Sequence, residues 1–587
     1  MISYLNIGES KYSGFTQKTV DFILNKQVKD VDLWNKFFSV FGTDADSSDN
    51  GWRCEYWGKM MRGACLIYAY TADEELYQIL RNAVFGLLEK QEQDGRISTY
   101  SRETEFHGWD MWGRKYVMVG LEYFYRICKS EEEKAAILVA LKAHADYILS
   151  KVGEDKIAIT ETSHMHGGLN SSSILDAFLQ LYLLTKEERY KRFGEYIIAC
   201  GGTNKGDLVS AIQQGVKPNE LPVTKAYEMM SFFEGFLTYY ECTGEEKYLN
   251  VAIQFFDLLE KYELSIVGSM GYAHEFFSDT ASRQTEYSEG LMLETCVTVT
   301  WIRVLSRLFT LTGNVKYVNL IEKATYNALY GALNFDLLDQ YCEEKDAYVK
   351  GLPFDSYSPL LGNRRGRGIG GFREFKDGSY YGCCACIGAA AVALFPLGSV
   401  MRQNNELMIN YYINGSIETI LTLGNKVKLD IQTNYPSDGK ICINIELEDE
   451  EEISLRLRIP DWCKNATVDE KDCFTKDGYY VIKVKDKQTI LLNLPMEMES
   501  VPLNGKIAFT RGPLTLGRDE YKEARRIDFN QEIKIDKLSE LPNEQDEYYR
   551  CVLQSENESI VLSDYKSCGK KWLNELGNIS VWHSISK

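Results

Sequence analysis

Three cysteines within four residues mark the part of the sequence best suited to chemistry. The segment 380–388, YYGCCACIG, places Cys383, Cys384 and Cys386 directly before the small-residue segment AAAVALFPLGSV. If that segment is a helix, the positive end of its dipole favours the thiolate form of these side chains. A thiolate binds zinc and also attacks carbon, so the cluster is a candidate for either chemistry. Packing of the thiols as small buried hydrophobic groups is the alternative.

A second candidate pair is Glu294 and Cys296, at the start of the apolar segment VTVTWIRVLSRLF. Side chains two residues apart on an ideal helix point to nearly opposite sides. Glu294 and Cys296 can therefore share a metal only where the backbone is not yet helical, as at the start of a helix. Together with Cys383 and Cys384 they would supply one carboxylate and three thiolates, a donor set suited to tetrahedral zinc.

Polar and aromatic residues in three other segments are candidates for contacts with a sugar. Aromatic rings offer large flat surfaces for the C–H faces of sugars, while charged and amide groups bond hydroxyls. Packing between helices is the alternative for Trp57 and Trp112, and a polar loop is the alternative for His164 and His166. The segments WRCEYWGKMM, HGWDMWGRK and SHMHGGLNSSS contain the candidates Glu55, Trp57, Lys59, Trp109, Asp110, Trp112, Arg114, His164, His166 and Asn170.

The elements that must position these residues begin with a repeated helical pattern up to about residue 400. Aromatic-rich segments end in Thr or Ser followed by a turn, usually acidic, which we interpret as N-cap chemistry for the next helix. Each interval between these turns is long enough for a pair of helices. We therefore expect helical hairpins that close into an (α/α)6 barrel, with an open solenoid as the alternative. The turns lie near Thr71, Ser130, Thr185, Thr243 and Thr312.

After Met401 the pattern changes to an alternation of apolar and polar residues, as in VKLDIQTNYP and ISLRLRIPDW. A period of two between Gly, Pro, Asn and Asp turns predicts half-buried antiparallel strands, and about 100 residues of them make one β-sandwich. The fold class expected is thus α followed by β. We predict an (α/α)6-barrel domain over residues 1–400, a β-sandwich over 401–502 and a second small β module, complete or incomplete, over 503–587.

The composition excludes some classes of partner. The 587 residues include 85 acidic and 66 basic side chains, for a net charge of −19, a field that repels nucleic acid and anionic membranes. We find no apolar run of about eighteen residues that would span a bilayer. The first residues have no signal-peptide pattern, so we expect a cytoplasmic protein with reduced cysteines. A homodimer is compatible with the sequence.

Several segments, in their order along the chain, resemble glycoside hydrolase family 127, the β-L-arabinofuranosidases formerly called a domain of unknown function, and the related family 146. The resemblance covers residues 50–515 and rests on LETCVTVTWIRVLSRLF, GCC, LRLRIPDW and LNGKIAFTRGPL. It implies an (α/α)6 barrel followed by β-sandwich domains. It also implies a zinc ion held by Glu294, Cys296, Cys383 and Cys384, with Cys383 as the nucleophile.

The resemblance further implies a general acid/base, a Glu in a Gly-Glu-x-Phe-like segment upstream of the Glu-x-Cys pair. The nearest match is Glu275 in AHEFF, and Glu286 and Glu289 are its competitors.

The sequence departs from the family pattern at two places. Ala-Cys-Ile, with Cys386 at its centre, follows the Cys-Cys pair where Pro-Pro-Asn is usual. Tyr116 and Glu234 stand near positions where the family has histidines around the sugar, so we include Glu234 among the candidate sugar contacts.

The function expected is that of a retaining glycoside hydrolase acting on an oligosaccharide or glycoconjugate. It would release a terminal β-L-arabinofuranose or a related uncommon sugar, with a zinc-bound Cys383 as nucleophile and Glu275 as acid/base. One alternative is a carbohydrate-binding or scaffolding barrel with a purely structural zinc site. The other is a different barrel enzyme, such as an epimerase or a lyase, which would not need the cysteines.

Overall fold

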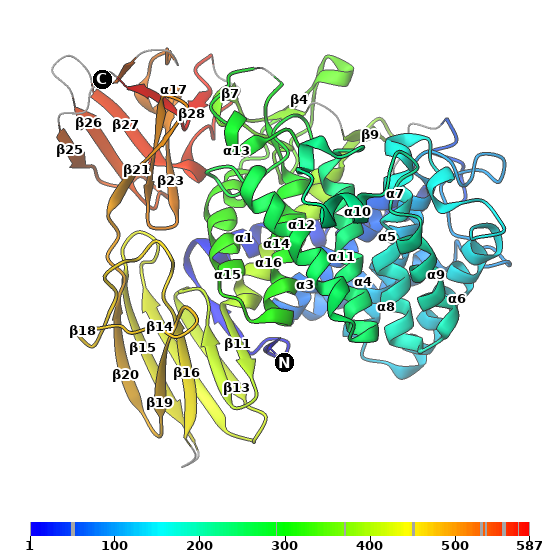
Figure 1. The fold of residues 1–587 in the computed structure, drawn as a ribbon, viewed down its shortest axis with the longest axis horizontal. Coiled ribbons are helices and arrows are strands. Elements are labelled where there is room, and N and C mark those ends of the chain that lie inside the picture. Colours follow the sequence, from blue (N-terminus) through cyan, green and yellow to red (C-terminus); the bar gives the residue numbers. More distant parts are fainter. Residues whose placement is uncertain are drawn as a thin grey trace.

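The computed structural model of the chain separates a helical part from a part built of strands (Figure 1). An (α/α)6 barrel is followed by β-sheet domains, which confirms the predicted fold class. The described residues are 2–48, 53–288, 290–368, 371–448, 452–528, 532–533, 537–554, 559–572 and 575–585.

Six inner helices form the ring of the barrel. Each packs on the next in chain order, and the last packs back on the first, so the ring is closed and the open solenoid is excluded. Apolar residues surround these helices on nearly all sides, as expected for helices covered both by their neighbours and by an outer layer. The inner helices are α3 (Cys54–Thr71), α5 (Asp110–Ile127), α8 (Leu175–Thr185), α11 (Ala226–Thr243), α14 (Thr295–Thr312) and α16 (Cys383–Ser399).

The outer layer consists of amphipathic helices that alternate with the inner ones along the chain. Shorter helices lie in the connections. The outer helices are α1 (Gly14–Ile23), α4 (Glu74–Leu88), α6 (Glu131–Lys151), α9 (Glu188–Ala199), α12 (Glu246–Tyr262) and α15 (Lys316–Ala324). The shorter ones are α2 (Val31–Ser39), α7 (Leu169–Ser172), α10 (Leu208–Gln213), α13 (Thr280–Arg283) and α17 (Glu520–Glu523).

The repeated turns have a different chemistry from the one predicted. Ser130 does cap the N-terminus of α6, where it accepts from the backbone N–H of Glu133 at 3.3 Å. The four threonines are instead the last residues of inner helices. Each Oγ1 donates to the carbonyl four residues before it, at 2.7–2.9 Å, and accepts from the N–H two residues after it, at 3.2–3.3 Å; the bonds belong to Thr71, Thr185, Thr243 and Thr312. The threonine therefore ends one helix and orients the turn that begins the next.

Two sheets form a sandwich beside the barrel, at the lower left of Figure 1. One sheet has the order β1-β11-β12-β16-β19 and the other β18-β17-β20-β15-β14-β13-β2. The strands are β1 (Ile2–Tyr4), β2 (Ser10–Tyr12), β11 (Val400–Gln403), β12 (Glu406–Ile409), β13 (Gly415–Ile420), β14 (Lys426–Thr433), β15 (Lys440–Leu447), β16 (Ile453–Arg458), β17 (Thr467–Val468), β18 (Lys471–Asp472), β19 (Tyr479–Val484) and β20 (Gln488–Asn493).

A third sheet contains the last part of the chain, in the order β24-β29-β22-β23-β27-β26-β25, with β21 and β28 attached. It also takes up β7 from the barrel region, because β7 pairs with β28. The strands are β7 (Leu361–Arg364), β21 (Met498–Leu503), β22 (Lys506–Arg511), β23 (Leu514–Asp519), β24 (Glu532–Ile533), β25 (Lys537–Glu540), β26 (Arg550–Gln554), β27 (Ser559–Asp564), β28 (Asn578–Ser580) and β29 (His583–Ile585).

Short strands occupy the connections that lead into α14 and α16. They form the pairs β3-β6 and β9-β10 and the three-stranded order β5-β4-β8. Their bounds are β3 (Leu293–Glu294), β4 (Gln340–Cys342), β5 (Ala347–Val349), β6 (Tyr357–Ser358), β8 (Arg367–Gly368), β9 (Phe372–Glu374) and β10 (Tyr380–Gly382).

The predicted domain limits at residues 400 and 502 stay a prediction, and pairing between strands crosses them. β1 and β2, from the first residues, pair with β11 and β13 of the sandwich. All fifteen cysteines lie in the described part of the chain and carry free thiols. No helix among the described residues combines the length and the apolar composition needed to cross a bilayer.

Candidate active site

One end of the barrel brings together the four residues predicted to hold a metal. The carboxylate of Glu294 and the thiols of Cys296, Cys383 and Cys384 offer ligand atoms that all lie within 4.8 Å of one another. The Sγ atoms of Cys296 and Cys384 are 3.4 Å apart, and Sγ of Cys384 is 3.5 Å from Oε1 of Glu294. The start of α14 thus meets the start of α16.

The backbone at Glu294 explains how residues two apart can face the same point. Glu294 ends strand β3 and is the N-cap of α14, with the extended angles φ −83° and ψ 137°. Cys296 is the second residue of the helix. The change from extended to helical backbone between them turns both side chains toward Cys384.

Cys383 is the first residue of α16, directly after the extended N-cap Gly382. Its N–H donates to the carbonyl of Gly371 at 3.0 Å, and a Cβ on Gly371 would lie 2.8 Å from Sγ of Cys383. Gly371 also has φ +84°, so glycine suits both this backbone conformation and the close approach of the thiol.

The four ligand groups differ in protonation. Hydrogen bonds from Cys296 and Cys384 hold the pKa of Cys383 well below its usual value, against the effect of burial, and the charge of Lys59 adds to the lowering. Burial raises the pKa values of Cys296 and Cys384 well above the usual range. Cys383 is accordingly the thiolate of the set. It is also the one member that is not fully buried.

The residues present fit a metal ion. Burial first, and then the charge of Cys383, raise the pKa of Glu294 to about 8, and its Oε2 is buried without a hydrogen-bond partner. Four acidic groups this close cannot all ionise in the protein interior unless a cation joins them. Three sulfurs and one oxygen are donors that suit zinc. The described group does not include Cys386, whose burial raises its pKa.

Glu275 lies beside this cluster in a tight loop, with left-handed φ values of 52° at His274 and 74° at Glu275 itself. Its Oε2 forms an ion pair with Lys225, and its Oε1 accepts a hydrogen bond from the hydroxyl of Tyr357 at 2.6 Å. Tyr357 is also the backbone partner of Glu294 in the β3-β6 pair. The candidate acid/base is therefore connected to the ligand cluster through one residue.

The two competitors for the acid/base role are placed differently. The exposed carboxylate of Glu286 forms a 2.9 Å ion pair with Arg283, three residues before it. Glu289 lies outside the described residues.

A group of buried side chains packs against the cluster. We call Glu55, Lys59 and Trp112 the catalytic floor. The ammonium of Lys59 is 3.1 Å from Oε1 of Glu55 and 3.8 Å from Sγ of Cys296. The indole N–H of Trp112 donates to the other oxygen of Glu55. Lys59 also lies 4.6 Å from the ring centre of Tyr227 and 5.5 Å from that of Tyr116. Glu55, Lys59 and Trp112, predicted as sugar contacts, thus form one connected group that reaches Sγ of Cys296 through Lys59.

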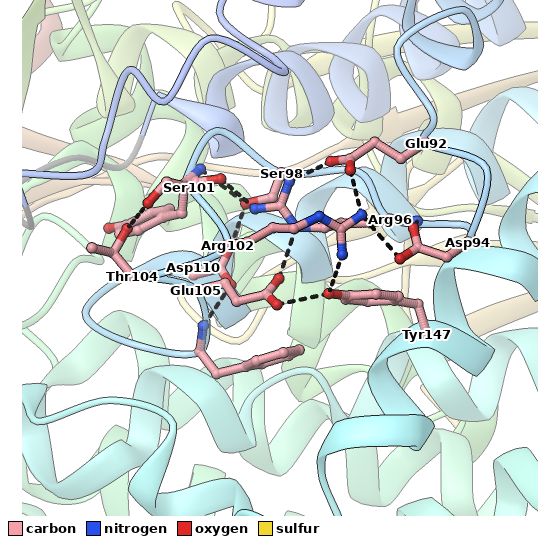
Figure 2. A network of polar contacts seen from close by, with 12 residues as sticks. Glu92, Asp94, Arg96, Ser98, Ser101, Arg102, Thr104, Glu105, Asp110 and Tyr147 are labelled. Atoms are coloured by element: carbon pink, nitrogen blue, oxygen red, sulfur yellow. Dashed lines mark hydrogen bonds and ion pairs between the residues drawn. The ribbon is translucent and has the colours of Figure 1, made fainter.

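Two other predicted sugar contacts, Asp110 and Arg114, belong to a buried network of ion pairs and hydrogen bonds. Asp110 and Arg114 form a 2.8 Å ion pair and are both fully buried, and Arg114 also pairs with Glu105 at 2.8 Å. Ser98 donates to Asp110. Figure 2 shows Asp110 and Glu105 among the neighbouring groups of this network. Their carboxylates and the guanidinium are engaged with protein partners, so these residues hold the loop before α5.

The remaining predicted contacts lie in three environments. The ring of His166 is 6.0 Å from that of Trp109 and 5.8 Å from that of Phe276, the neighbour of Glu275, so these side chains gather near the acid/base. His164 is exposed, with its ring 4.5 Å from that of His107.

Trp57, Asn170 and Glu234 have protein surroundings. Trp57 is fully buried against α5, and Asn170 donates to the carbonyl of Gly108 at 2.9 Å. Glu234 pairs with Arg303 and Arg307 toward the other end of the barrel.

Sequence reasoning did not identify Lys225, Tyr227 or Tyr357 as residues of the site. Tyr357 reaches Glu275 through the pairing of two strands of two residues each, which are too short to give a periodic signal. Lys225 stands directly before α11, where a lone basic residue has no motif.

Comparison with known proteins identifies related sequences and folds. A family model described as the β-L-arabinofuranosidase, GH127 catalytic domain, matches residues 13–356, and the model of the GH127 middle domain matches residues 406–498. Cys383 and Cys384 lie between the two matched ranges. No protein of curated function matches the sequence.

Two solved structures share the whole fold. One is Ara127N-Se, a GH127 β-L-arabinofuranosidase from Geobacillus stearothermophilus T6, with a TM-score of 0.72 and 17% identity over 100% of both chains. The other is the GH127 β-arabinofuranosidase BT3674, with a TM-score of 0.72 and 16% identity over 100% of this chain and 98% of that one.

Proposed function

Because the chain belongs to glycoside hydrolase family 127, we propose that it removes a terminal β-L-arabinofuranose, or a related uncommon sugar, with Cys383 as nucleophile and Glu275 as acid/base. The chain is a glycoside hydrolase of the β-L-arabinofuranosidase type. One observation supports the proposed mechanism. Cys383, the one thiol of the cluster that is partly exposed, lies near Glu275, which is connected to the same cluster through Tyr357.

Glu294, Cys296, Cys383 and Cys384 would hold a zinc ion in this proposal. Bound there, zinc would keep the sulfurs deprotonated and would stabilise the negative charge on Cys383 when that thiolate leaves the sugar. The ammonium of Lys59, 3.8 Å from Cys296, would offset part of the negative charge of the thiolates.

The first half of the reaction forms a bond between Sγ of Cys383 and the anomeric carbon. The bond from that carbon to the leaving oxygen breaks, and Glu275 gives its proton to this oxygen. In the second half Glu275, now a carboxylate, takes a proton from water. The water oxygen attacks the anomeric carbon, the carbon–sulfur bond breaks, and Cys383 returns as a thiolate. Two displacements retain the configuration.

Lys225 and Tyr357 both favour the carboxylate form of Glu275, which is the form needed for the second half. They also fix the direction of its two oxygens, so the proton is delivered to a defined place. The first half requires the protonated form, so Glu275 would take up a proton from solvent before the reaction, and a sugar that displaces Lys225 from the carboxylate would favour this uptake.

Among the predicted sugar contacts, Trp109, His164 and His166 are proposed to meet the substrate on the Glu275 side. Glu55, Lys59 and Trp112 would form the floor of the pocket, so they would face the sugar or support the sulfur atoms. The remaining five would act as supports because their polar groups bond protein atoms or their rings are buried; they are Trp57, Asp110, Arg114, Asn170 and Glu234.

The Cys383→Ala variant tests the mechanism, with Cys386→Ala as its matched control. We expect hydrolysis of an aryl β-L-arabinofuranoside to fall by about 10⁴-fold or more in the first variant, the scale of losing a nucleophile, and by little in the second. Both variants should remain folded, although Cys383→Ala, which lacks one proposed zinc ligand, should unfold at a lower temperature than Cys386→Ala. Full activity of Cys383→Ala would refute the nucleophile.

A purely structural zinc site is the remaining alternative. Such a site is closed and has all its ligands engaged, whereas Cys383 is partly exposed. The same pair of variants separates the two functions, because loss of a purely structural ligand would lower the unfolding temperature of Cys383→Ala and leave the rate of hydrolysis by the folded protein nearly unchanged.

A further inference from the structure

A cavity with several charged side chains in its wall lies toward the end of the barrel opposite the cysteine cluster. Its volume is about 290 Å³, and all six inner helices contribute to its wall together with Tyr4 of β1. The catalytic cysteines stand in the first turns of α14 and α16. Residues in the middle and last turns of the inner helices, such as Arg62, Glu122 and Glu234, line this cavity instead.

Arg62 is the unusual member of the wall. Its side chain is 2% exposed, and its Nε and Nη2 atoms have no hydrogen-bond partner. No carboxylate in the described parts of the chain forms an ion pair with it. The guanidinium carbon lies 5.7 Å from the ring centre of Tyr116, a ring that Lys59 of the catalytic floor also contacts. Burial opposes its charge, but Tyr116, Tyr123 and Glu234 raise the pKa of Arg62, so the guanidinium stays charged while two of its buried nitrogens lack an acceptor, which an oxyanion would supply.

The ionised carboxylates of the wall already have partners. Glu234 pairs with Arg303, and Arg307 pairs with Asp176 at 3.0 Å and with Glu241 at 2.5 Å. Arg62 is not a member of these ion pairs, and Glu234 shares its charge with Arg303 and Arg307.

The fourth acid of the wall, Glu122, is 1% exposed, and its Oε1 has no partner. Burial raises the pKa of Glu122 well above its ordinary value, so it is an uncharged acid that can donate a hydrogen bond. It therefore does not neutralise Arg62.

The pKa of the neighbouring Lys115 is consistent with the same local excess of positive charge. Burial, and then the charges of Arg303 and Arg62, lower the pKa of Lys115 well below its usual range. Its Nζ lies 3.2 Å from Oγ of Ser173 and 4.0 Å from the ring centre of Trp112, and it forms no ion pair among the described residues.

We propose that this cavity binds a small oxyanion, a carboxylate or a phosphate, whose charge is neutralised by Arg62. Guanidinium groups bind these planar or tetrahedral oxyanions by charge-assisted hydrogen bonds, and the neutral Glu122 can add a donor. The volume accommodates a molecule of a few heavy atoms. The site is distinct from the catalytic one, and the proposal does not depend on the mechanism of Cys383.

Calorimetric titration of the full-length protein with acetate, and separately with inorganic phosphate, tests this site at constant ionic strength. We expect saturable binding of acetate, of phosphate or of both. The anion that binds identifies whether the natural ligand is a carboxylate or a phosphate. Arg62→Met should weaken it by about tenfold or more, the loss of a strong charge-assisted contact. Arg192→Met on the exposed face of α9 is the matched control and should leave binding unchanged.

Lys225→Met separates this cavity from the catalytic pocket, which also contains cations, and it should retain the binding. Loss in Lys225→Met with retention in Arg62→Met would place the anion in the catalytic pocket and overturn the proposal. Absence of saturable binding with both anions would show that water alone fills the cavity, and would also overturn it. If Arg62→Met does not fold, the wild-type and Lys225→Met titrations still decide between these outcomes.

Discussion

The hydroxyl of Tyr357 lies 2.6 Å from Oε1 of Glu275, and the backbone of the same tyrosine pairs with that of Glu294. One residue thus sets the position of the proposed acid/base relative to the proposed metal ligands. The side chain acts on Glu275, whereas only the main chain acts on Glu294. The two connections can therefore be separated by mutation.

Tyr357→Phe removes the hydroxyl and keeps both the ring and the strand pair. We expect kcat/KM to fall by about tenfold, the equivalent of one hydrogen bond to a charged group. The zinc content should be unchanged, since the link to Glu294 is made by the main chain. Kinetics and metal analysis of the same sample measure both quantities. A loss of zinc would show that the side chain supports the ligands instead.

Glu275→Gln removes the proton donor of the first step. We expect a fall in rate of roughly 10²- to 10⁴-fold, smaller for a 4-nitrophenyl leaving group, which needs little protonation, than for an alkyl one. Comparison of kcat/KM for the two substrates measures the difference. Glu286→Gln is the control, because this exposed carboxylate pairs only with its neighbour Arg283 among the described residues. A larger loss in the control would transfer the role to Glu286.

Metal analysis tests the ligand set. We expect about one equivalent of zinc per chain in the purified protein, as for a four-ligand site. Cys296→Ser should lower this occupancy and the unfolding temperature together, because binding to the folded state alone stabilises it. Cys386→Ser should retain both. Full occupancy in Cys296→Ser would exclude Cys296 from the set.

Asp176 makes the stability of the barrel depend on acid pH. Burial would raise the pKa of Asp176, but Arg307, Thr238 and Arg303 outweigh it and lower the pKa to about 2 from its ordinary 3.8. Because the folded-state pKa is the lower one, the stabilisation is present above about pH 4 and is lost as the pH falls toward 2.

Asp176→Asn should therefore lower the free energy of unfolding at pH 7 by about 2 kcal/mol and flatten its decline between pH 4 and pH 2. Urea denaturation at a series of pH values measures this. Asp257→Asn removes a surface partner of Lys316 whose side chain is 48% exposed, and it should change little. Equal effects of the two substitutions would contradict the special role of the part-buried Asp176–Arg307 pair.

Some features of the protein follow from local sequence alone. These features are patterns of neighbouring residues: helices that end in Thr, alternating strands after Met401, and cysteines directly before a small-residue helix. Such patterns predict helices, strands and helix starts, and from these the barrel and the sandwich. The predicted positions of the polar turns agree with the structure, but the hydrogen bond predicted for their threonines, an N-cap of the next helix, was wrong. Thr71 bonds backward to Ile67 as well as forward to Asp73, and both bonds fit the same sequence.

Other features depend on segments that are distant in the chain. The strand β1 joins β11 almost 400 residues later, and β7 of the barrel region joins β28 near the end. A strand of three or four residues has too little pattern to specify its partner, because its pairing energy comes mostly from the surface it joins.

The sequence by itself determined the donor types of this protein: one carboxylate and three thiols at helix starts, and a glutamate upstream of them. Only the tertiary structure decided which other side chains interact with these groups. It placed Lys59 3.8 Å from Cys296 and joined Tyr357 and Lys225 to Glu275. The reason is physical. A charged side chain in a barrel interior must find its partner across helices, and that choice depends on packing between segments that no local pattern encodes.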